Sequence, residues 1–543
     1  MTSIVQVNVS QTIAPTPNKL QKTGAIISQG ATNTSPGTKS LITQGSDLTP
    51  ILLGALTLSV LTWSGGVVTA TAVSPHGYTI GDELWLTISG ATPTGYNGTY
   101  FCTVTTSSAV TYVVAATLSS PASVPGSYTD ADVAELSSQI NTFFSQGSGQ
   151  AVYVLELGAG DEQDGVAFLT AWITANPLVF YSYLVPREWD SNSYFLAFLA
   201  GFNNTTSKTY FFVTTTLATW QNYTNLLKCV VAMIECPSYS AWAANILTAI
   251  TYNGGYVTAT TTTNHGVGVG QYFTINGVTP IGYNGTYKAL AGTTGNTLVY
   301  AVSSVLGAES VLGTLVASYY TSAGIPPNEF SHAADFQVSL NYNPSTTNKV
   351  TPFQFSFLFG VTPFPTQGNS SILQQLKNAA VNVVGTGAEG GISDTILLWG
   401  TTMDANQFTY WYSCDWVQIN LDLDTSNAVI NGSNNPINPL YNNQQGINVL
   451  QGVGAATLSR GISYGLVLGS VIQTNYTGPQ LVDAIDADQF GGFANINAIP
   501  FIPYNKENLG DYKLGKYAGL TVIYTPQLGF ESIIYNVNIT TFV

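Results

Sequence analysis

The chain has 543 residues, of which 45% are hydrophobic and 12% aromatic but only 8% charged, whereas soluble domains usually carry about 25% charged residues. The aromatic content excludes intrinsic disorder, and the length predicts several domains. The net charge of −15 and the lack of any basic cluster in the sequence exclude nucleic acid as a main partner. So few charges imply that the surface consists of Thr, Ser, Asn and Gln, or that neighbouring subunits cover it.

The N-terminal 40 residues predict an extended arm. Ser3 to Val9 alternates valine with Gln6 and Asn8, which indicates a strand, and the Pro-, Thr-, Asn- and Gly-rich stretch 11–40 predicts a flexible reach. A lone terminal strand is unstable and must pair with a sheet of its own chain or of a neighbour. The first residues lack the pattern of a secretory signal, and the apolar window 51–63 is too short and too polar to cross a bilayer. No membrane partner is therefore expected.

An internal repeat comes next. Residues 58–126 and 247–313 align over their whole length, and each contains the run Gly-Tyr-Asn-Gly-Thr-Tyr, at 95–100 and at 282–287. Alternating Thr and Val predict two all-β, small sandwich-like modules inserted into a host domain, and Asn97-Gly98 with Asn284-Gly285 predicts type I′ hairpins.

The host segments 41–57, 127–246 and 314–325 alternate helix and strand. We expect a helix N-capped by Thr129, with Asp132 completing a partial capping box. Further helices are expected over 164–176, 191–199 and 220–227, and strands over 151–157, 178–185, 209–214 and 230–234. This alternation predicts a mainly parallel sheet flanked by helices.

The remaining segment, 326–531, predicts an α+β domain. Helices are expected over 370–381 and 446–468, and strands from Tyr517 onward. The last residues, 532–543, predict a second arm strand. The whole chain is thus expected to be an α/β and α+β multidomain protein with a mixed sheet, two inserted modules and strand-forming ends.

Two short motifs resemble catalytic sites. Residues 461–465 match the GxSxG nucleophile elbow, but a helical pattern precedes them and the last histidine, His332, lies upstream, so we reject a hydrolase of that type. Residues 385–390 match GxGxxG, with Asp404 at a suitable distance, yet no convincing helix follows. A glycine-rich loop is the favoured interpretation.

Metal and carboxylate chemistry has little support. His76 and His265 occupy equivalent repeat positions before glycine, which indicates a turn role, and no metal-ligand spacing is present. Acidic residues cluster in three places, where solvated carboxylates are favoured although a glycosidase pair stays open: Asp161, Glu162 and Asp164; Asp422 and Asp424; Asp483, Asp486 and Asp488. The second set begins like a calcium loop, but Ser433 stands where the loop needs Glu.

Aromatic and cysteine residues add two expectations. The aromatic run 408–416 is typical of a core or an interface, although it could also stack sugars. The four cysteines lack CxxC spacing and indicate buried thiols, as expected of a protein assembled in the cytoplasm. The sequence therefore predicts no catalytic residue, no cofactor and no metal.

The host domain resembles the contractile tail sheath proteins of phages. The resemblance lies in the order of elements: a helix over 133–144 followed by the strand 152–157, the glycine-rich stretch 382–390, Cys414-Asp415-Trp416, and a strand-forming tail. The stretches 336–348 and 360–363 are similar to a branch of this family found in some myovirus tails. The two repeated modules are similar to small β modules of phage structural proteins and depart from the simplest sheaths.

The resemblance implies a function and partners. Sheath subunits form six-fold rings, stacked helically around a tail tube between baseplate and tail terminator proteins, in a virion tail assembled in the host cytoplasm. Terminal arms add strands to sheets of neighbouring subunits, and contraction drives the tube through the host envelope. On this basis the inter-subunit arm residues are Ile4, Val5, Val7, Val9, Tyr535, Val537, Ile539, Thr541 and Val543. The C-terminal part would face the tube and the modules would face solvent.

Two other classes stay open. A surface-layer or adhesin-like protein would fit the acidic, Thr- and Asn-rich composition and the repeated modules, but the missing export signal argues against it. A tail-associated glycan hydrolase would need a cleft holding a carboxylate of raised pKa.

Overall fold

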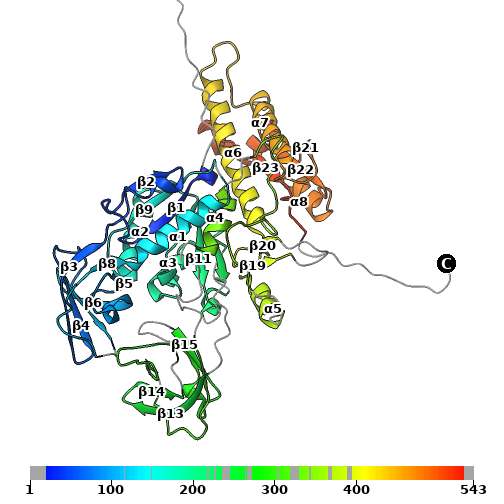
Figure 1. Ribbon diagram of the computed structural model, residues 1–543. Helices are drawn as coiled ribbons and strands as arrows, with labels where there is room; N and C mark the ends of the chain where they lie inside the picture. Colours follow the sequence, from blue (N-terminus) through cyan, green and yellow to red (C-terminus); the bar gives the residue numbers. More distant parts are fainter. Residues whose placement is uncertain are drawn as a thin grey trace, which may run out of the picture. The chain divides into compact units, whose positions relative to one another are not determined.

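The computed structural model describes residues 20–114, 117–147, 149–216, 219–224, 228–234, 245–262, 265, 272–302, 305–317, 329–340, 344–364, 370–387 and 394–530. It is a mixed α/β multidomain structure with several sheets and, in these ranges, ten α-helices (Figure 1). The described residues form two compact units. We call residues 23–340 with 353–408 the main unit, and residues 20–22, 344–352 and 409–530 the C-terminal unit.

A six-stranded sheet forms the centre of the main unit, and its five parallel strands confirm the expected parallel architecture. The strand order is β12-β11-β10-β1-β9-β2, with only β2 antiparallel to its neighbour. The strands are β1 (Gly24–Ser28), β2 (Lys39–Ile42), β9 (Val152–Glu156), β10 (Ser182–Leu184), β11 (Tyr210–Thr215) and β12 (Val230–Ile234).

Helices cover both faces of this sheet. Adjacent strand residues point to opposite faces: the ring of Phe211 packs on Phe198 of α3, and that of Phe212 packs on Phe336 of α4. Helix α1 packs on α4 through Phe143. The helices of the main unit are α1 (Ala131–Ser145), α2 (Glu162–Ala175), α3 (Ser193–Ala200), α4 (Ser331–Leu340) and α5 (Ser370–Asn378), with short 3-10 turns at Gly45–Asp47, Arg187–Trp189 and Trp220–Tyr223.

Three local predictions for the main unit are wrong. The expected arm 1–40 contains β1, whose five residues are all buried at the centre of the sheet. The short apolar run Ala25-Ile26-Ile27 is sufficient for such a buried strand, although polar sequence surrounds it. Helix α1 is capped by Asp130, whose side chain accepts a hydrogen bond from the Asp132 backbone, rather than by Thr129. The helix expected over 220–227 is only a 3-10 turn in its described part.

The first repeat forms a closed barrel in the order β3-β4-β7-β6-β5-β8. Its strands are β3 (Leu56–Ser64), β4 (Val67–Ala72), β5 (Glu83–Ser89), β6 (Gly98–Thr106), β7 (Ala109–Val113) and β8 (Ser127–Asp130), with a 3-10 turn at Thr94–Tyr96. Strand β8 leads directly into α1, because Asp130 is both its last residue and the helix cap.

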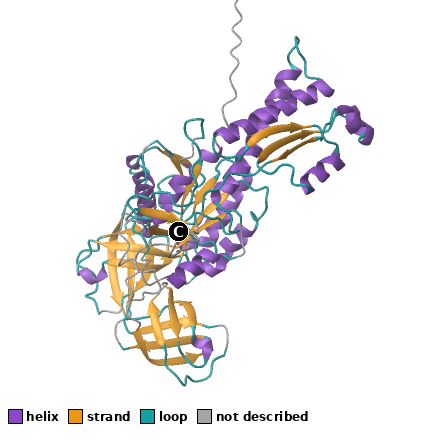
Figure 2. Ribbon diagram, turned by 90° about the vertical axis from the view of Figure 1, so that its right-hand side faces the viewer, coloured by secondary structure: helices purple, strands orange, loops and turns teal. Residues whose placement is uncertain are grey.

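The second repeat forms a six-stranded sheet in the order β16-β15-β18-β13-β14-β17 (strands drawn in orange in Figure 2). Its strands are β13 (Asn245–Asn253), β14 (Tyr256–Thr261), β15 (Tyr272–Asn276), β16 (Gly285–Lys288), β17 (Thr297–Ala301) and β18 (Thr314–Ala317), with a 3-10 turn at Ile281–Tyr283. The repeats share fine detail, since β3 and β13 carry a bulge at equivalent positions.

The predicted Asn-Gly hairpins are wrong. Asn97 has a negative φ, and its side-chain amide closes a loop by bonding both the N–H and the C=O of Ala91. The two-residue hairpin lies at Gly65-Gly66, where both residues have positive φ as a type I′ turn requires, and at Gly254-Gly255 in the second repeat.

The C-terminal unit combines long helices with a three-stranded sheet in the order β21-β22-β23. Strands β21 (Ser470–Thr474) and β22 (Phe493–Ala498) are parallel, and β23 (Leu520–Ile523) is antiparallel to β22. The helices are α6 (Phe408–Ser433), α7 (Gln444–Ser463), α8 (Gly478–Asp486), α9 (Phe501–Glu507) and α10 (Leu509–Lys513), and a 3-10 turn covers Leu20–Lys22. The predicted helix over 446–468 is confirmed as α7.

The boundary of the predicted domain 326–531 differs from that of the compact units. Residues 329–340 and 353–408 belong to the main unit, including the hairpin of β19 (Val383–Thr386) and β20 (Thr395–Leu398). The reason is long-range pairing: Asn382 extends the main sheet beside β12, a contact that no local sequence pattern announces.

Candidate assembly surfaces

The nine predicted arm residues lie outside the described residues: Ile4, Val5, Val7, Val9, Tyr535, Val537, Ile539, Thr541 and Val543. The structure does describe the residues that adjoin both terminal segments. Leu20 is buried, and the Gln21 side chain donates a hydrogen bond to the Tyr412 carbonyl of α6 at 2.9 Å. At the other end, Gln527 N donates to the Leu466 carbonyl at 2.9 Å. Both segments thus start from the C-terminal unit.

The C-terminal sheet has open edges. Strands β21 and β23 are its outer strands, and within the described ranges neither has a further strand beside it. The edge strand β21 leaves Ser470 and Gln473 exposed, while helices cover the two faces of the sheet. Gln451 of α7 donates to the carbonyls of Thr474 and Ile496 on one face, and Leu481 of α8 packs on the other. Helices therefore cover both faces of this sheet, whereas no further strand among the described residues covers its edge along β21.

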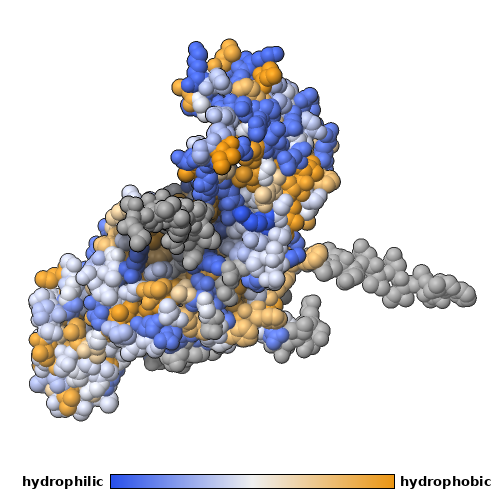
Figure 3. Space-filling view, turned by 90° about the horizontal axis from the view of Figure 1, so that it is seen from above, coloured by the Kyte–Doolittle hydropathy of each residue, from blue (hydrophilic) through white to orange (hydrophobic). Residues whose placement is uncertain are grey.

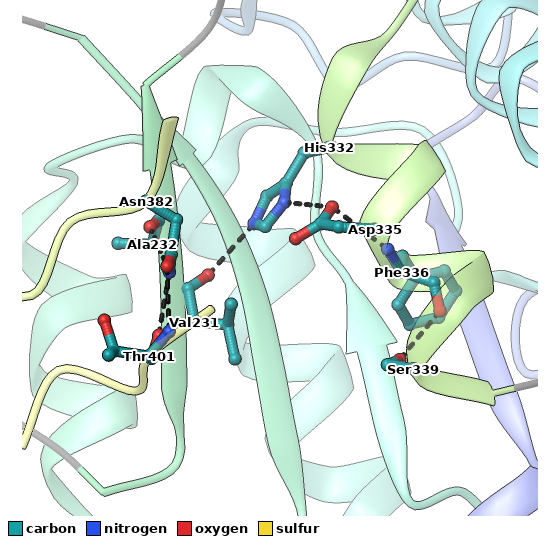
Figure 4. A network of polar contacts seen from close by, with 8 residues as sticks. All are labelled: Val231, Ala232, His332, Asp335, Phe336, Ser339, Asn382 and Thr401. Carbon is teal, nitrogen blue, oxygen red and sulfur yellow. Dashed lines mark hydrogen bonds and ion pairs between the residues drawn. The ribbon is translucent and has the colours of Figure 1, made fainter. Parts of the chain in front are cut away.

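The main sheet has, by contrast, an additional segment along its β12 edge. Asn382 pairs with β12 through two backbone hydrogen bonds, with Asn382 N donating to the Ala232 carbonyl at 2.8 Å and Ile234 N donating to the Asn382 carbonyl at 3.0 Å. The Asn382 side-chain amide also donates to the carbonyls of Ala232 and Thr401, and its oxygen accepts from Thr401 N (Figure 4). This side chain fastens the segment to the sheet edge.

His332 fixes α4 to the same strand. Its Nε2 lies 2.9 Å from the Val231 carbonyl and its Nδ1 lies 2.7 Å from the Asp335 carboxylate, and all three groups are buried (Figure 4). Both ring nitrogens thus face oxygen atoms that can accept hydrogen bonds. Burial raises the pKa of Asp335, while the neighbouring His332 opposes that shift. This buried pair is structural, because it anchors a helix to a sheet.

The carboxyl ends of the parallel strands, where open α/β sheets bind ligands, are occupied by internal contacts. The buried Glu156 carboxylate accepts hydrogen bonds from the backbone N–H groups of Gly30, Thr32 and Gly158, and from the hydroxyls of Ser28 and Thr32. These contacts use the acceptor capacity of the carboxylate to hold the loop after β1.

Among the buried carboxyl groups, Asp190 and Asp130 have pKa values raised to about 6. Burial raises the pKa of Asp190 to about 6, although the hydroxyls of Thr219 and Tyr223 donate to it at 2.5 and 2.9 Å and oppose that shift. Burial also raises the pKa of Asp130 to about 6, while the Asp132 N–H and the Tyr78 hydroxyl favour its charged form. Asp130 connects the barrel to α1.

The residues that match the two catalytic motifs lie in a helix, a hairpin strand and a loop. Ser463 of the GxSxG match ends α7 and donates to the Arg460 carbonyl at 2.9 Å, which confirms the helical interpretation. Thr386 of the GxGxxG match ends a short hairpin strand, and residues 388–390 lie outside the described residues. Asp404 accepts from Thr402 and Asn406 within its own loop.

Asp424 and His76 have local partners. Asp422 and Asp424 lie within the continuous helix α6 and therefore not in a calcium-binding loop, and Asp424 pairs with Arg460 at 2.5 Å. His76 Nδ1 accepts from Tyr78 N at 3.1 Å, as expected of a turn residue. Cys102 and Cys229 are buried thiols and Cys414 is half-buried, whereas Cys236 lies outside the described residues.

Neither a metal centre nor a membrane-spanning helix emerges from the described ranges. No group of three or more His, Cys, Asp or Glu side chains there could hold a metal ion. Likewise, no helix in the described part of the chain is long and apolar enough to cross a bilayer.

No family model matches the chain, and no curated protein matches it. Among solved structures, the chain is similar to the sheath tail protein Lin1278 from Listeria innocua, with 9% identity and a TM-score of 0.34 over 93% of this chain and 94% of that one. A likeness at this level does not define function, which is therefore argued from the chain's own residues.

Proposed function

We propose that this chain is the structural subunit of a contractile phage tail sheath. In this role it polymerises as six-fold rings stacked around a tail tube, held together by exchange of terminal arm strands. The observation that carries the proposal is the edge of β21, which has no further strand beside it among the described residues, in the unit from which both terminal segments begin. Both terminal segments carry strand patterns that need a partner sheet.

The reach of the segments is compatible with exchange between copies. Nineteen residues precede Leu20, and an extended chain spans up to roughly 3.3 Å per residue, so the N-terminal segment reaches roughly 60 Å. That distance exceeds the width of a small domain. Strand addition supplies backbone hydrogen bonds while leaving each folded unit unchanged, so the linked subunits can rotate as rigid bodies.

The surface composition also supports assembly. Apolar residues lie among hydrophilic ones across the surface seen in Figure 3, and many large apolar side chains are exposed, including Ile437 at 93% and Phe530 at 78%. Contiguous exposed apolar patches are typical of surfaces that partners cover, so these side chains are candidates for contacts between copies. On this proposal the partners are further copies of the chain, the tail tube, and the baseplate and terminator proteins.

Electron microscopy of negatively stained protein tests the proposal. The full chain should form tubes of stacked rings, and a variant that lacks residues 1–12 should not. Flat lattices from both samples would favour a surface-layer protein instead. Dispersed monomers from the full chain, even with the tail tube added as a template, would contradict the proposal.

A further inference from the structure

Helix α8 presents an acidic and apolar surface. Its inner side chains Leu481 and Ala484 are buried against the C-terminal sheet. Its outer side exposes Val482 at 55% and Ile485 at 47%, three positions apart and therefore on one stripe of the helix. We define the acidic face as Val482, Asp483, Ile485, Asp486 and Asp488, all of which are exposed. No Lys or Arg occurs between residues 461 and 505 to balance these charges.

Helices α9 and α10 present a surface of the opposite charge. We define the basic face as Lys506, Leu509, Tyr512, Lys513, Leu514 and Lys516, all exposed. Leu509 is 77% exposed, Leu514 67% and Tyr512 56%. Two acids lie nearby: Glu507 is exposed, and Asp511 accepts a hydrogen bond from the Tyr504 hydroxyl at 2.6 Å. Three lysines within eleven residues are a local exception in a chain of net charge −15.

Internal contacts hold the basic face in shape. Tyr504 is buried, and its hydroxyl oxygen also accepts from Ala518 N at 2.8 Å. The ring of Phe501 contacts that of Tyr512 edge to face, with centroids 5.8 Å apart. The face is therefore formed before any partner binds, which lowers the entropic cost of docking.

The two faces are complementary but do not meet within one copy. Each combines exposed apolar side chains with charges of one dominant sign, and the signs are opposite. Among the described residues no hydrogen bond, ion pair or ring contact joins them. Because the faces are different surfaces of one unit, a contact between copies through them is heterologous, and such contacts build rings or helical arrays.

We propose that the acidic face of α8 docks on the basic face of α9–α10 in a second copy of this chain. This contact rests on the proposed self-assembly, but it is separate from strand exchange and uses side chains rather than arms. Apolar contact between the two faces supplies affinity, while the opposed carboxylates and ammonium groups set register and exclude the reverse pairing.

Charge reversal on one face at a time tests the contact. Variant one carries Lys513→Glu and Lys516→Glu, so both of its faces are acidic; variant two carries Asp483→Lys and Asp486→Lys, so both are basic. Each variant alone should self-associate more weakly than the unaltered chain, because its arms are intact but its faces repel each other. A mixture should associate more strongly, because the acidic faces of one variant meet the basic faces of the other. Sedimentation velocity should give an affinity in the mixture roughly tenfold or more above that of either variant alone, weakening as salt rises.

Matched controls separate this contact from net charge and from the arms. Lys39→Glu with Lys349→Glu gives the same net charge as variant one at exposed positions off both faces, and should associate as the unaltered chain does. A mixture that associates no more than its components overturns the inference. If the unaltered chain and both variants all form tubes, the inference fails while the sheath proposal stands. If the mixture associates but no tubes form, the inference stands while the sheath proposal fails.

Discussion

The main sheet and the C-terminal sheet differ in what lies along their edges. In the main unit, Asn382 extends the sheet beside β12, and its side chain binds the neighbouring backbone. In the C-terminal unit, β21 ends its sheet with no further strand among the described residues. Natural proteins normally cover or blunt such edges. The β12 edge is therefore completed within the chain, whereas β21, like the edge strand β2 of the main sheet, has no further strand beside it among the described residues and can receive one from elsewhere.

The largest effect is expected from blunting the open edge. Ser470→Lys with Gln473→Lys places two exposed charges along β21, which disfavours addition of another strand. Assembly into tubes, followed by light scattering, should be lost, while the melting temperature of the unassembled chain should stay within about 2 °C because neither side chain is buried. Equal assembly by this variant and the unaltered chain would exclude β21 as the strand that accepts an arm.

A large loss of stability is expected when the contact of His332 with β12, at the edge of the main sheet, is removed. His332→Ala removes the partner of the buried Asp335 and the contact with the Val231 carbonyl. Breaking one side of a buried pair costs about 3–5 kcal/mol, and chemical denaturation of the main unit should detect that decrease. A decrease below about 1 kcal/mol would show that the pair contributes little to holding α4 on the sheet.

A smaller effect is expected from pH at the buried Asp190. Since burial raises its pKa to about 6, above the value of about 3.9 in an unfolded chain, its contribution to stability is complete below about pH 4 and is lost as pH rises through 6. Asp190→Asn should reduce the change in unfolding free energy between pH 4 and 7 by about 2 kcal/mol. An unchanged pH profile would contradict the shifted pKa.

The smallest effect is expected at the pair of Arg460 and Asp424 between α7 and α6. Their side chains are 40% and 24% exposed, and exposed pairs contribute about 0–1 kcal/mol. Arg460→Ala should therefore lower the unfolding free energy by less than about 1 kcal/mol, as measured by urea denaturation. A loss comparable to that of His332→Ala would mean that this exposed pair stabilises the fold as much as the buried pair of His332 and Asp335 does.

The sequence predicted the parallel sheet well, because its strands are short apolar runs that alternate with segments of helical periodicity, as at 230–234. It missed β1, whose apolar run is only three residues long, and it could not foresee that Asn382 pairs with β12, because that contact joins residues 150 positions apart. The Asn-Gly prediction failed because the Asn97 side chain forms a local loop with Ala91.

The candidate site was only partly accessible to sequence analysis. The strand pattern at both ends predicted arms, but an acceptor edge depends on which strands pair, as with β21 beside β22. The acidic residues Asp483 and Asp486 were recognised as solvated, but their shared face with Val482 and Ile485 required the orientation of α8.

Cross-linking between copies tests the central claim, that β21 accepts an arm from another subunit. A copy with Gln473→Cys is mixed with a tagged copy carrying Val7→Cys or Val537→Cys, and the mixture is oxidised and separated without reducing agent. The account predicts a mixed dimer with at least one arm, and none when Lys39→Cys on β2 replaces Gln473→Cys. No mixed dimer with either arm, or equal yields from β21 and β2, would contradict it.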